Sequence, residues 1–171
     1  MPRIALPSIP SLSSIPSLPA MLVLALAAGA ALASERPPAD GKPLSQILET
    51  VAQNHPGVII SAEFDDRRWD VVSCGDDGRN CRELRVDPRS GQTLRERHER
   101  NSEPRPPAGA KTAAQIAHGV EQQQLGTITE IEFERGLWEV SLRGDDVRAK
   151  LYVDPASGDI QRCRGRGCPA R

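Results

Sequence analysis

Six carboxylates recur at matching positions in two parts of the chain, where an extended strand would point them to the same side. Paired acids of this kind can bind calcium or carry out acid–base chemistry. The chain around them lacks the dense Asp, Asn and Gly loop of calcium sites, and outward positions of a sheet with one covered face are polar by default. We therefore predict no metal site and expect these side chains to face a partner. They are Glu63, Asp65, Asp70, Glu132, Glu134 and Glu139.

Four cysteines form two close pairs, Cys74 with Cys81 and Cys163 with Cys168. Their connectivity is not fixed by the sequence, although strand alternation places Cys74 and Cys81 together on the outer side of one hairpin. A four-cysteine zinc site is the alternative, but intervals of 7 and 5 residues do not fit the usual Cys-x-x-Cys knuckle. We expect all four cysteines to form disulfides, which export from the cytoplasm would favour.

Three histidines could act as bases near neutral pH, namely His55, His98 and His118, but none accompanies a nucleophile motif. The chain also contains no Gly-x-Ser-x-Gly, His-Glu-x-x-His or phosphate-binding loop. We therefore predict that the protein is not an enzyme and has no catalytic residue and no cofactor. With 23 acidic and 22 basic side chains there is no basic excess, so nucleic acid is not an expected partner.

Residues 1–33 predict a secretory signal peptide. They contain no acid and carry a purely apolar run, Met21–Leu32, which is shorter than the roughly 20 residues that cross a bilayer. Small residues precede an expected cleavage site after Ala33, and translation can begin at Met1 or at Met21. We expect a periplasmic or secreted protein with no stable membrane insertion after cleavage.

The same pattern of residues occurs twice along the chain. Helix and first-hairpin residues match at an offset of 69, and the register then shifts to an offset of 67. The shift falls between Trp69 and Leu84, where glycines and aspartates predict a longer hairpin loop in the first copy. Residues that define the pattern are Phe64, Trp69, Asp87, Pro88 and Gly91, matched by Phe133, Trp138, Asp154, Pro155 and Gly158.

Each copy predicts one amphipathic helix followed by four antiparallel strands. Apolar residues at i, i+3, i+4 and i+7 begin at Leu44 and at Ala113, and Thr112 with Gln115 has the spacing of a capping box. In the first copy, period-two alternation then places Ile60, Ala62, Phe64, Trp69 and Val71 on the covered face. In the second copy, the same alternation places Ile131, Phe133, Trp138, Val140 and Leu142 there. The fold class is therefore α+β, with each helix covering one face of a sheet.

These elements divide the chain into six segments. Charged and proline-rich residues between the copies predict an extended linker, and a short fourth strand closes each copy, at residues 92–95 and 159–162. The segments are a signal peptide (1–33), an N-terminal segment (34–41), a first repeat (42–95), a linker (96–109), a second repeat (110–162) and a basic tail with two cysteines (163–171).

Both copies resemble the PepSY domain family. The residues that carry the resemblance are a helix stripe, Gly-x-Ile, Glu-Phe-(Asp/Glu)-x-x-x-Trp-(Asp/Glu)-Val and Leu-x-Val-Asp-Pro-x-Ser-Gly, found over residues 43–94 and 112–160. The resemblance implies a module that restrains peptidases or binds other proteins outside the cytoplasm. The tandem arrangement is also similar to the fold of a secreted β-lactamase inhibitor, which presents a joint sheet surface to its partner.

We therefore expect an exported module that binds a protein partner, a peptidase or an envelope sensor, through its open sheet faces. The alternative is a periplasmic protein that binds a small ligand or a metal. The tail carries Arg162, Arg164, Arg166 and Arg171 without an acid. It could contact an acidic partner or an anionic envelope surface, although a solvated terminus is the default interpretation.

Overall fold

The computed structural model describes residues 36–75, 78–99 and 104–169, and within them the chain forms two helices and eight strands. The predicted signal peptide and its cleavage site lie outside the described residues. The first half contains α1 (Leu44–Asn54), β1 (Val58–Asp65), β2 (Arg68–Cys74), β3 (Cys81–Val86) and β4 (Thr93–Glu99). The second half contains α2 (Ala113–Gln122), β5 (Thr127–Glu134), β6 (Leu137–Arg143), β7 (Arg148–Val153) and β8 (Ile160–Arg166).

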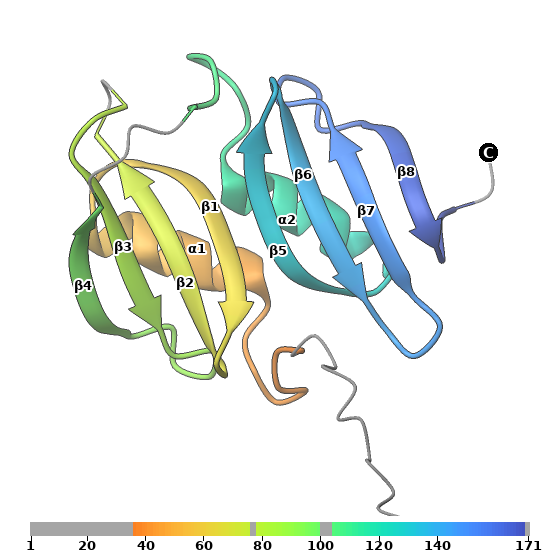
Figure 1. The fold of residues 1–171 in the computed structure, drawn as a ribbon, viewed down its shortest axis with the longest axis horizontal. Helices are drawn as coiled ribbons and strands as arrows, with labels where there is room; N and C mark the ends of the chain where they lie inside the picture. The colour runs from red at the N-terminus through yellow and green to blue at the C-terminus, as the bar shows by residue number, and fades with distance from the viewer. Residues whose placement is uncertain (1–35, 76–77, 100–103, 170–171) are drawn as a thin grey trace, which may run out of the picture. The chain divides into compact units, whose positions relative to one another are not determined.

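The strands form one antiparallel sheet in the order β4-β3-β2-β1-β5-β6-β7-β8. β1 and β5 join the two halves at its centre, where Ala62 lies opposite Ile131 and Glu63 lies opposite Glu130. Both helices lie on the same side of this sheet (Figure 1). The other side, which we call the outer face, carries no helix in the part of the chain that the structure describes. No described helix is long and apolar enough to cross a bilayer.

A shared hydrophobic core lies between the helices and the sheet, with buried residues from both halves. Trp69 and Trp138 are 1% and 0% exposed, so the prediction that both indoles are buried is confirmed. Each indole packs edge-on against a phenylalanine, Phe64 or Phe133, with ring centroids 5.3 Å apart. Each half is so small that, by itself, it would bury too little surface to be more than marginally stable. The common core therefore stabilises both halves together.

An Asp-Pro-x-Ser-Gly turn follows the third strand of each half. In the first half, Oδ1 of Asp87 accepts a hydrogen bond from the backbone N–H of Ser90 at 2.7 Å, and this bond holds the pKa of Asp87 below its ordinary value. Asp154 accepts equivalent bonds in the second half, and its pKa is lowered for the same reason. The carbonyl of Pro88 accepts a hydrogen bond from the backbone N–H of Lys42 at 2.9 Å. The turn therefore fixes the segment that leads into α1.

Ile60 lies on the outer face, so the prediction that it points into the core is wrong. The pairing of β1 with β2 shifts between Ile59 and Ser61. Such a β-bulge adds one residue to a strand and locally changes which side its residues face. Ile60 packs instead with Cys74 and Cys81, which form a disulfide on the outer face.

The fourth strand of each half is longer than the sequence predicts. The expected strand of residues 92–95 continues as β4 to Glu99, and the expected strand of residues 159–162 continues as β8 to Arg166. Both are edge strands, where charged side chains are common because they discourage pairing with other chains. The charge runs that predicted a linker and a solvated tail therefore belong partly to strands.

The two helices are capped differently. α1 has Pro43 at its N-cap, which provides no side-chain acceptor, and Glu121 near the end of α2 supplies one instead. Glu121 accepts a hydrogen bond from the backbone N–H of Ser45 at 3.1 Å and another from its hydroxyl at 2.5 Å. α2 is capped locally by Thr112 and Gln115, as the sequence predicts. A single carboxylate therefore links the second helix to the beginning of the first.

Replacing Glu121 with alanine should lower the free energy of unfolding by about 1–2 kcal/mol, which is the usual cost of losing an N-cap. Urea denaturation followed by circular dichroism would measure the change. Glu49→Ala is the matched control, because Glu49 is an exposed glutamate on α1, and it should change stability by less than about 0.5 kcal/mol. Equal losses in the two variants would contradict a capping role for Glu121.

Candidate functional site

Five carboxylates lie along the junction of β1 and β5 on the outer face, and we call them the acidic seam. They alternate with residues that point into the core, such as Phe64 and Ile131. Glu63 lies directly opposite Glu130 across the junction. The seam consists of Glu63, Asp65, Glu130, Glu132 and Glu134.

The seam is only partly neutralised. Lys150 lies 3.8 Å from Glu130, and Arg135 lies 3.0 Å from Glu134. Within the described part of the chain, no ion pair compensates the other three seam carboxylates. Partial burial raises the pKa of Glu63, and the charges of Glu130, Asp65 and Asp70 raise it further. Burial likewise raises the pKa of Glu132, with Glu130 and Glu134 as the largest charge contributions. These carboxylates therefore ionise less readily in the folded protein.

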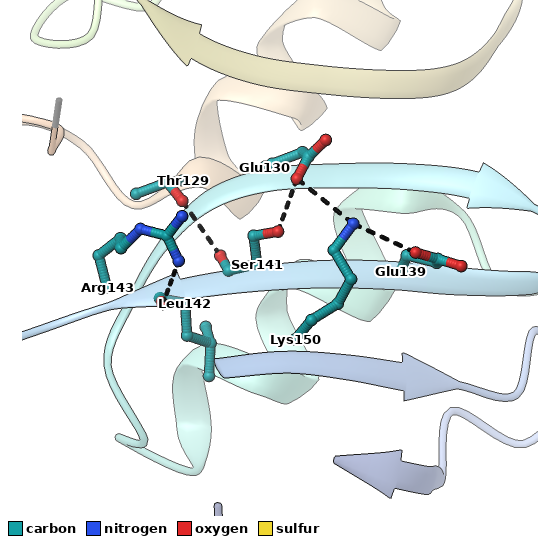
Figure 2. Close-up of polar contacts among 7 residues, drawn as sticks. All are labelled: Thr129, Glu130, Glu139, Ser141, Leu142, Arg143 and Lys150. Atoms are coloured by element: carbon teal, nitrogen blue, oxygen red, sulfur yellow. Dashed lines mark hydrogen bonds and ion pairs between the residues drawn. The ribbon is translucent and has the colours of Figure 1, made fainter. Parts of the chain in front are cut away.

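The sequence also predicts that Asp70 and Glu139 face a partner, and both lie beside the seam. Asp70 is 3.2 Å from the guanidinium of Arg85, although partial burial leaves its pKa raised. Glu139 is only 7% exposed, and Lys150 donates a hydrogen bond to it at 3.2 Å (Figure 2). Because Glu139 is covered and paired, it is the least accessible of the six predicted carboxylates.

Two residues of this surface were not identified from the sequence. Glu130 accepts a hydrogen bond from the hydroxyl of Ser141 at 2.6 Å, and Lys150 lies between Glu130 and Glu139 (Figure 2). Burial alone would lower the pKa of Lys150, but Glu130 and Glu139 raise it above its ordinary value. Neither residue has a like-charged counterpart in the first half, where Ser61 and Glu83 occupy the equivalent positions. The sequence does contain a signal for Glu130, because Glu130, Glu132 and Glu134 are spaced two residues apart in β5 and therefore share one side of the strand.

Charge changes sign across the outer face. The strand pairings place one residue from each strand in a continuous row, with acids in the middle and bases at both edges. From β4 to β8 the row is Arg95, Arg85, Asp70, Glu63, Glu130, Ser141, Lys150 and Arg164. This face can therefore select a partner by charge.

The cysteines are joined as Cys74–Cys81 and Cys163–Cys168. The first disulfide connects the ends of β2 and β3, and the second closes a small ring at the end of β8. All four cysteines are within the described residues and none is free, so no thiolate is available as a zinc ligand or as a nucleophile.

The three histidines do not come together. Nε2 of His55 lies 3.0 Å from the hydroxyl of Thr93, and Nδ1 lies 3.6 Å from the carboxylate of Glu96. His98 lies on β4 and His118 on α2. Among the residues described by the structure, no three His, Cys, Asp or Glu side chains are grouped so that they could hold a metal ion.

Two grooves occupy equivalent places beside the helices. One, of about 540 Å³, lies between the end of α1 and the segment before α2, and the other, of about 590 Å³, lies between the end of α2 and the segment before α1. In the second groove Glu121 bonds to Ser45, whereas the equivalent residues in the first are Ala52 and Ala114. The first groove therefore has two methyl groups where the second has a hydrogen-bonded polar pair, while Glu49, Arg105 and Lys111 also line it. Its volume suits a small molecule.

Comparisons with known proteins give one structural and one family similarity. A crystal structure from Clostridium difficile 630, described as a lipoprotein, is similar at 14% identity with a TM-score of 0.44, covering 71% of this chain and 91% of that chain. No curated protein matches the sequence. Neither of the two similarities indicates an enzyme family. Residues 18–97 match the peptidase propeptide and YPEB domain family, so this part of the chain contains a PepSY domain, as its motifs predict.

Proposed function

We propose that the protein is an exported binding module that modulates or inhibits a peptidase, or acts on an envelope sensor, through the outer face of its sheet. The acidic seam is the observation that carries this proposal. Its carboxylates lie on the sheet face that carries no described helix, and the family of peptidase propeptides favours a peptidase as the partner. The action would be steric and electrostatic, without any catalytic group of the module itself.

The energetic cost of the seam supports a role in binding. Like charges directly opposite each other in a sheet destabilise it, and Glu63 lies opposite both Glu130 and Asp70. A surface that served stability alone would place a base or a neutral residue at one of these positions. Destabilising arrangements of this kind are typical of sites retained for function.

The proposal includes the architecture and the cellular location. We propose that the halves are tandem PepSY repeats, residues 42–95 and 110–162, in an arrangement similar to the β-lactamase-inhibitor-like fold. The same order of elements in the two halves supports this. Residues 1–33 would direct export to the periplasm or the medium, and two disulfides are consistent with an oxidising compartment.

Neutralising the seam should stabilise the protein at neutral pH. Because the pKa values of Glu63 and Glu132 are raised on folding, the folded state holds these protons more tightly than the unfolded state. Their contribution is therefore most favourable at low pH and is lost as the pH rises above about 4. Glu63→Gln and Glu132→Gln should raise the urea midpoint at pH 7 and lose this gain near pH 3, whereas Glu49→Gln should change neither. A gain that persists unchanged at low pH would exclude the carboxylate charge, through its burial and its repulsion by neighbouring acids, as the cause.

The same substitutions should weaken partner binding. The immobilised protein, mixed with an envelope and culture fraction of its source cells, should retain a peptidase identified by mass spectrometry and lower the proteolytic activity of that fraction. A variant with Glu63, Asp65 and Glu132 changed to Gln, Asn and Gln should lose both effects. A variant that carries Glu49→Gln and Asp146→Asn, exposed acids away from the seam, should retain them. Failure of the unaltered protein to retain any peptidase or any envelope sensor would contradict the proposal.

The apolar groove beside α1 favours a second candidate function, the binding of a small apolar molecule. Its apolar lining includes Leu48, Ala52, Ile59 and Ala114, and the polar pair of the equivalent groove is missing. A hydrophobic dye such as ANS should bind the purified protein, and Ala52→Glu, which introduces the carboxylate of the other groove, should abolish this binding. Dye binding that is unaffected by Ala52→Glu would assign the signal to another surface.

A further inference from the structure

Basic side chains cover the outer side of the sheet at the edge of the second half. The pairing of β7 with β8 places Arg148 opposite Arg166, Lys150 opposite Arg164, and Tyr152 opposite Arg162. Lys150 is bound to Glu139, so its charge is compensated. We call the remaining four cations the arginine cluster: Arg148, Arg162, Arg164 and Arg166.

The arginine cluster has no acidic partner among the residues that the structure describes. No carboxylate of the described residues forms an ion pair with any of its four members, and Arg148 and Arg166 face each other as like charges. Directly opposed like charges in a sheet are unfavourable. The arrangement therefore lowers the stability of this edge unless an anion from outside binds there.

The first half provides an internal comparison, because its residues occupy equivalent positions in the same register. There, Glu83 lies opposite Arg97 and forms an ion pair with it, whereas the second half has Lys150 opposite Arg164. The equivalent of Arg148 is Cys81, which is part of a disulfide. The unpaired cluster is therefore a property of the second half and not of the fold.

Two of the four arginines are held in place by an aromatic ring. The guanidinium carbon of Arg162 lies 3.9 Å from the ring centroid of Tyr152, and that of Arg164 lies 5.7 Å from it. Contacts of this kind restrict long side chains, so less conformational entropy is lost when a ligand binds. The equivalent of Tyr152 in the first half is Arg85, which pairs with Asp70 instead.

We propose that the arginine cluster binds an extended acidic segment of a protein partner. Guanidinium groups bind carboxylates through two parallel hydrogen bonds. In an extended chain, alternate residues on one side repeat every 6.6–6.8 Å or so, and the alternate residues Arg162 and Arg164 of β8 have the same period. A segment with acids at alternate positions, lying along β8, would therefore meet successive arginines with successive carboxylates.

The neighbouring acidic seam favours a narrow ligand over an anionic membrane. Both surfaces lie on the outer face, and only β6 and β7 separate the seam strand β5 from β8. A flat anionic surface that covered the arginine cluster would also approach Glu132 and Glu134 and be repelled by them. A single peptide segment can contact β7 and β8 alone. This inference rests on the proposed binding function and specifies the chemistry of the partner.

A labelled peptide of about seven residues with glutamate at alternate positions and threonine between them tests the proposal. Fluorescence anisotropy should show binding that weakens between about 20 mM and about 300 mM salt, and a peptide with glutamine in place of glutamate should not bind. Changing Arg162 and Arg164 together to Gln should weaken binding by about tenfold or more. Changing Arg95 and Arg97 to Gln removes the same charge at the equivalent positions of β4 and should alter the affinity by less than about twofold.

If the two double variants lost the same affinity for the acidic peptide, the effect would come from net charge alone, and the proposal would be overturned. It would also be overturned if the glutamine peptide bound equally well, or if phosphatidylglycerol vesicles bound through Arg162 and Arg164 while the acidic peptide did not bind. The anisotropy measurement uses a synthetic peptide and no peptidase, so it is independent of the experiment that captures a peptidase. Failure of either experiment therefore leaves the other result interpretable.

Discussion

The pairing of β1 with β5 is the constraint on which the rest of the structure depends. Ala62 and Ile131, both fully buried, meet on the core side of this junction, and the helices pack over them as part of one core. The same backbone pairing places Glu63 opposite Glu130 on the outer face. Because successive residues of a strand point to opposite sides, the favourable contact in the core and the unfavourable contact outside are produced together. The junction thus couples the stability of the protein to the charge of its exposed surface.

The two halves have the same order of elements but differ in how they satisfy the same physical requirements. α2 begins with its own capping box, whereas α1 depends on Glu121 from the other half. That difference changes the character of the two grooves, because the carboxylate that caps α1 lines one of them and alanine stands at the equivalent place in the other. Local changes at a few positions have therefore given equivalent places in the fold different surfaces.

The sequence predicts those features that local chemistry determines. Alternation places Trp69 and Trp138 in the core, and residue spacing predicts the capping box of α2 correctly. The sequence does not predict that Ile60 lies on the outer face, because a β-bulge depends on pairing between strands. It also misses Glu130 and Lys150, whose importance comes from the residues they face across β5, β6 and β7. The ends of β4 and β8 are missed because charged residues on an edge strand look like a solvated linker.

The opposite charges of the outer face bear on how a partner could dock. A partner that covered the whole face would have to present bases over the acidic seam and acids over the arginine cluster, in a fixed order along one direction. Such a pattern excludes most proteins, because each mismatched contact places like charges together. A neutral polar surface would tolerate many partners. The first half is closer to such a surface, because ion pairs such as that of Arg97 with Glu83 neutralise its charges. Under the proposed binding function, the unpaired charges would be the source of specificity, and a complex with a complementary surface would recover the stability that they cost.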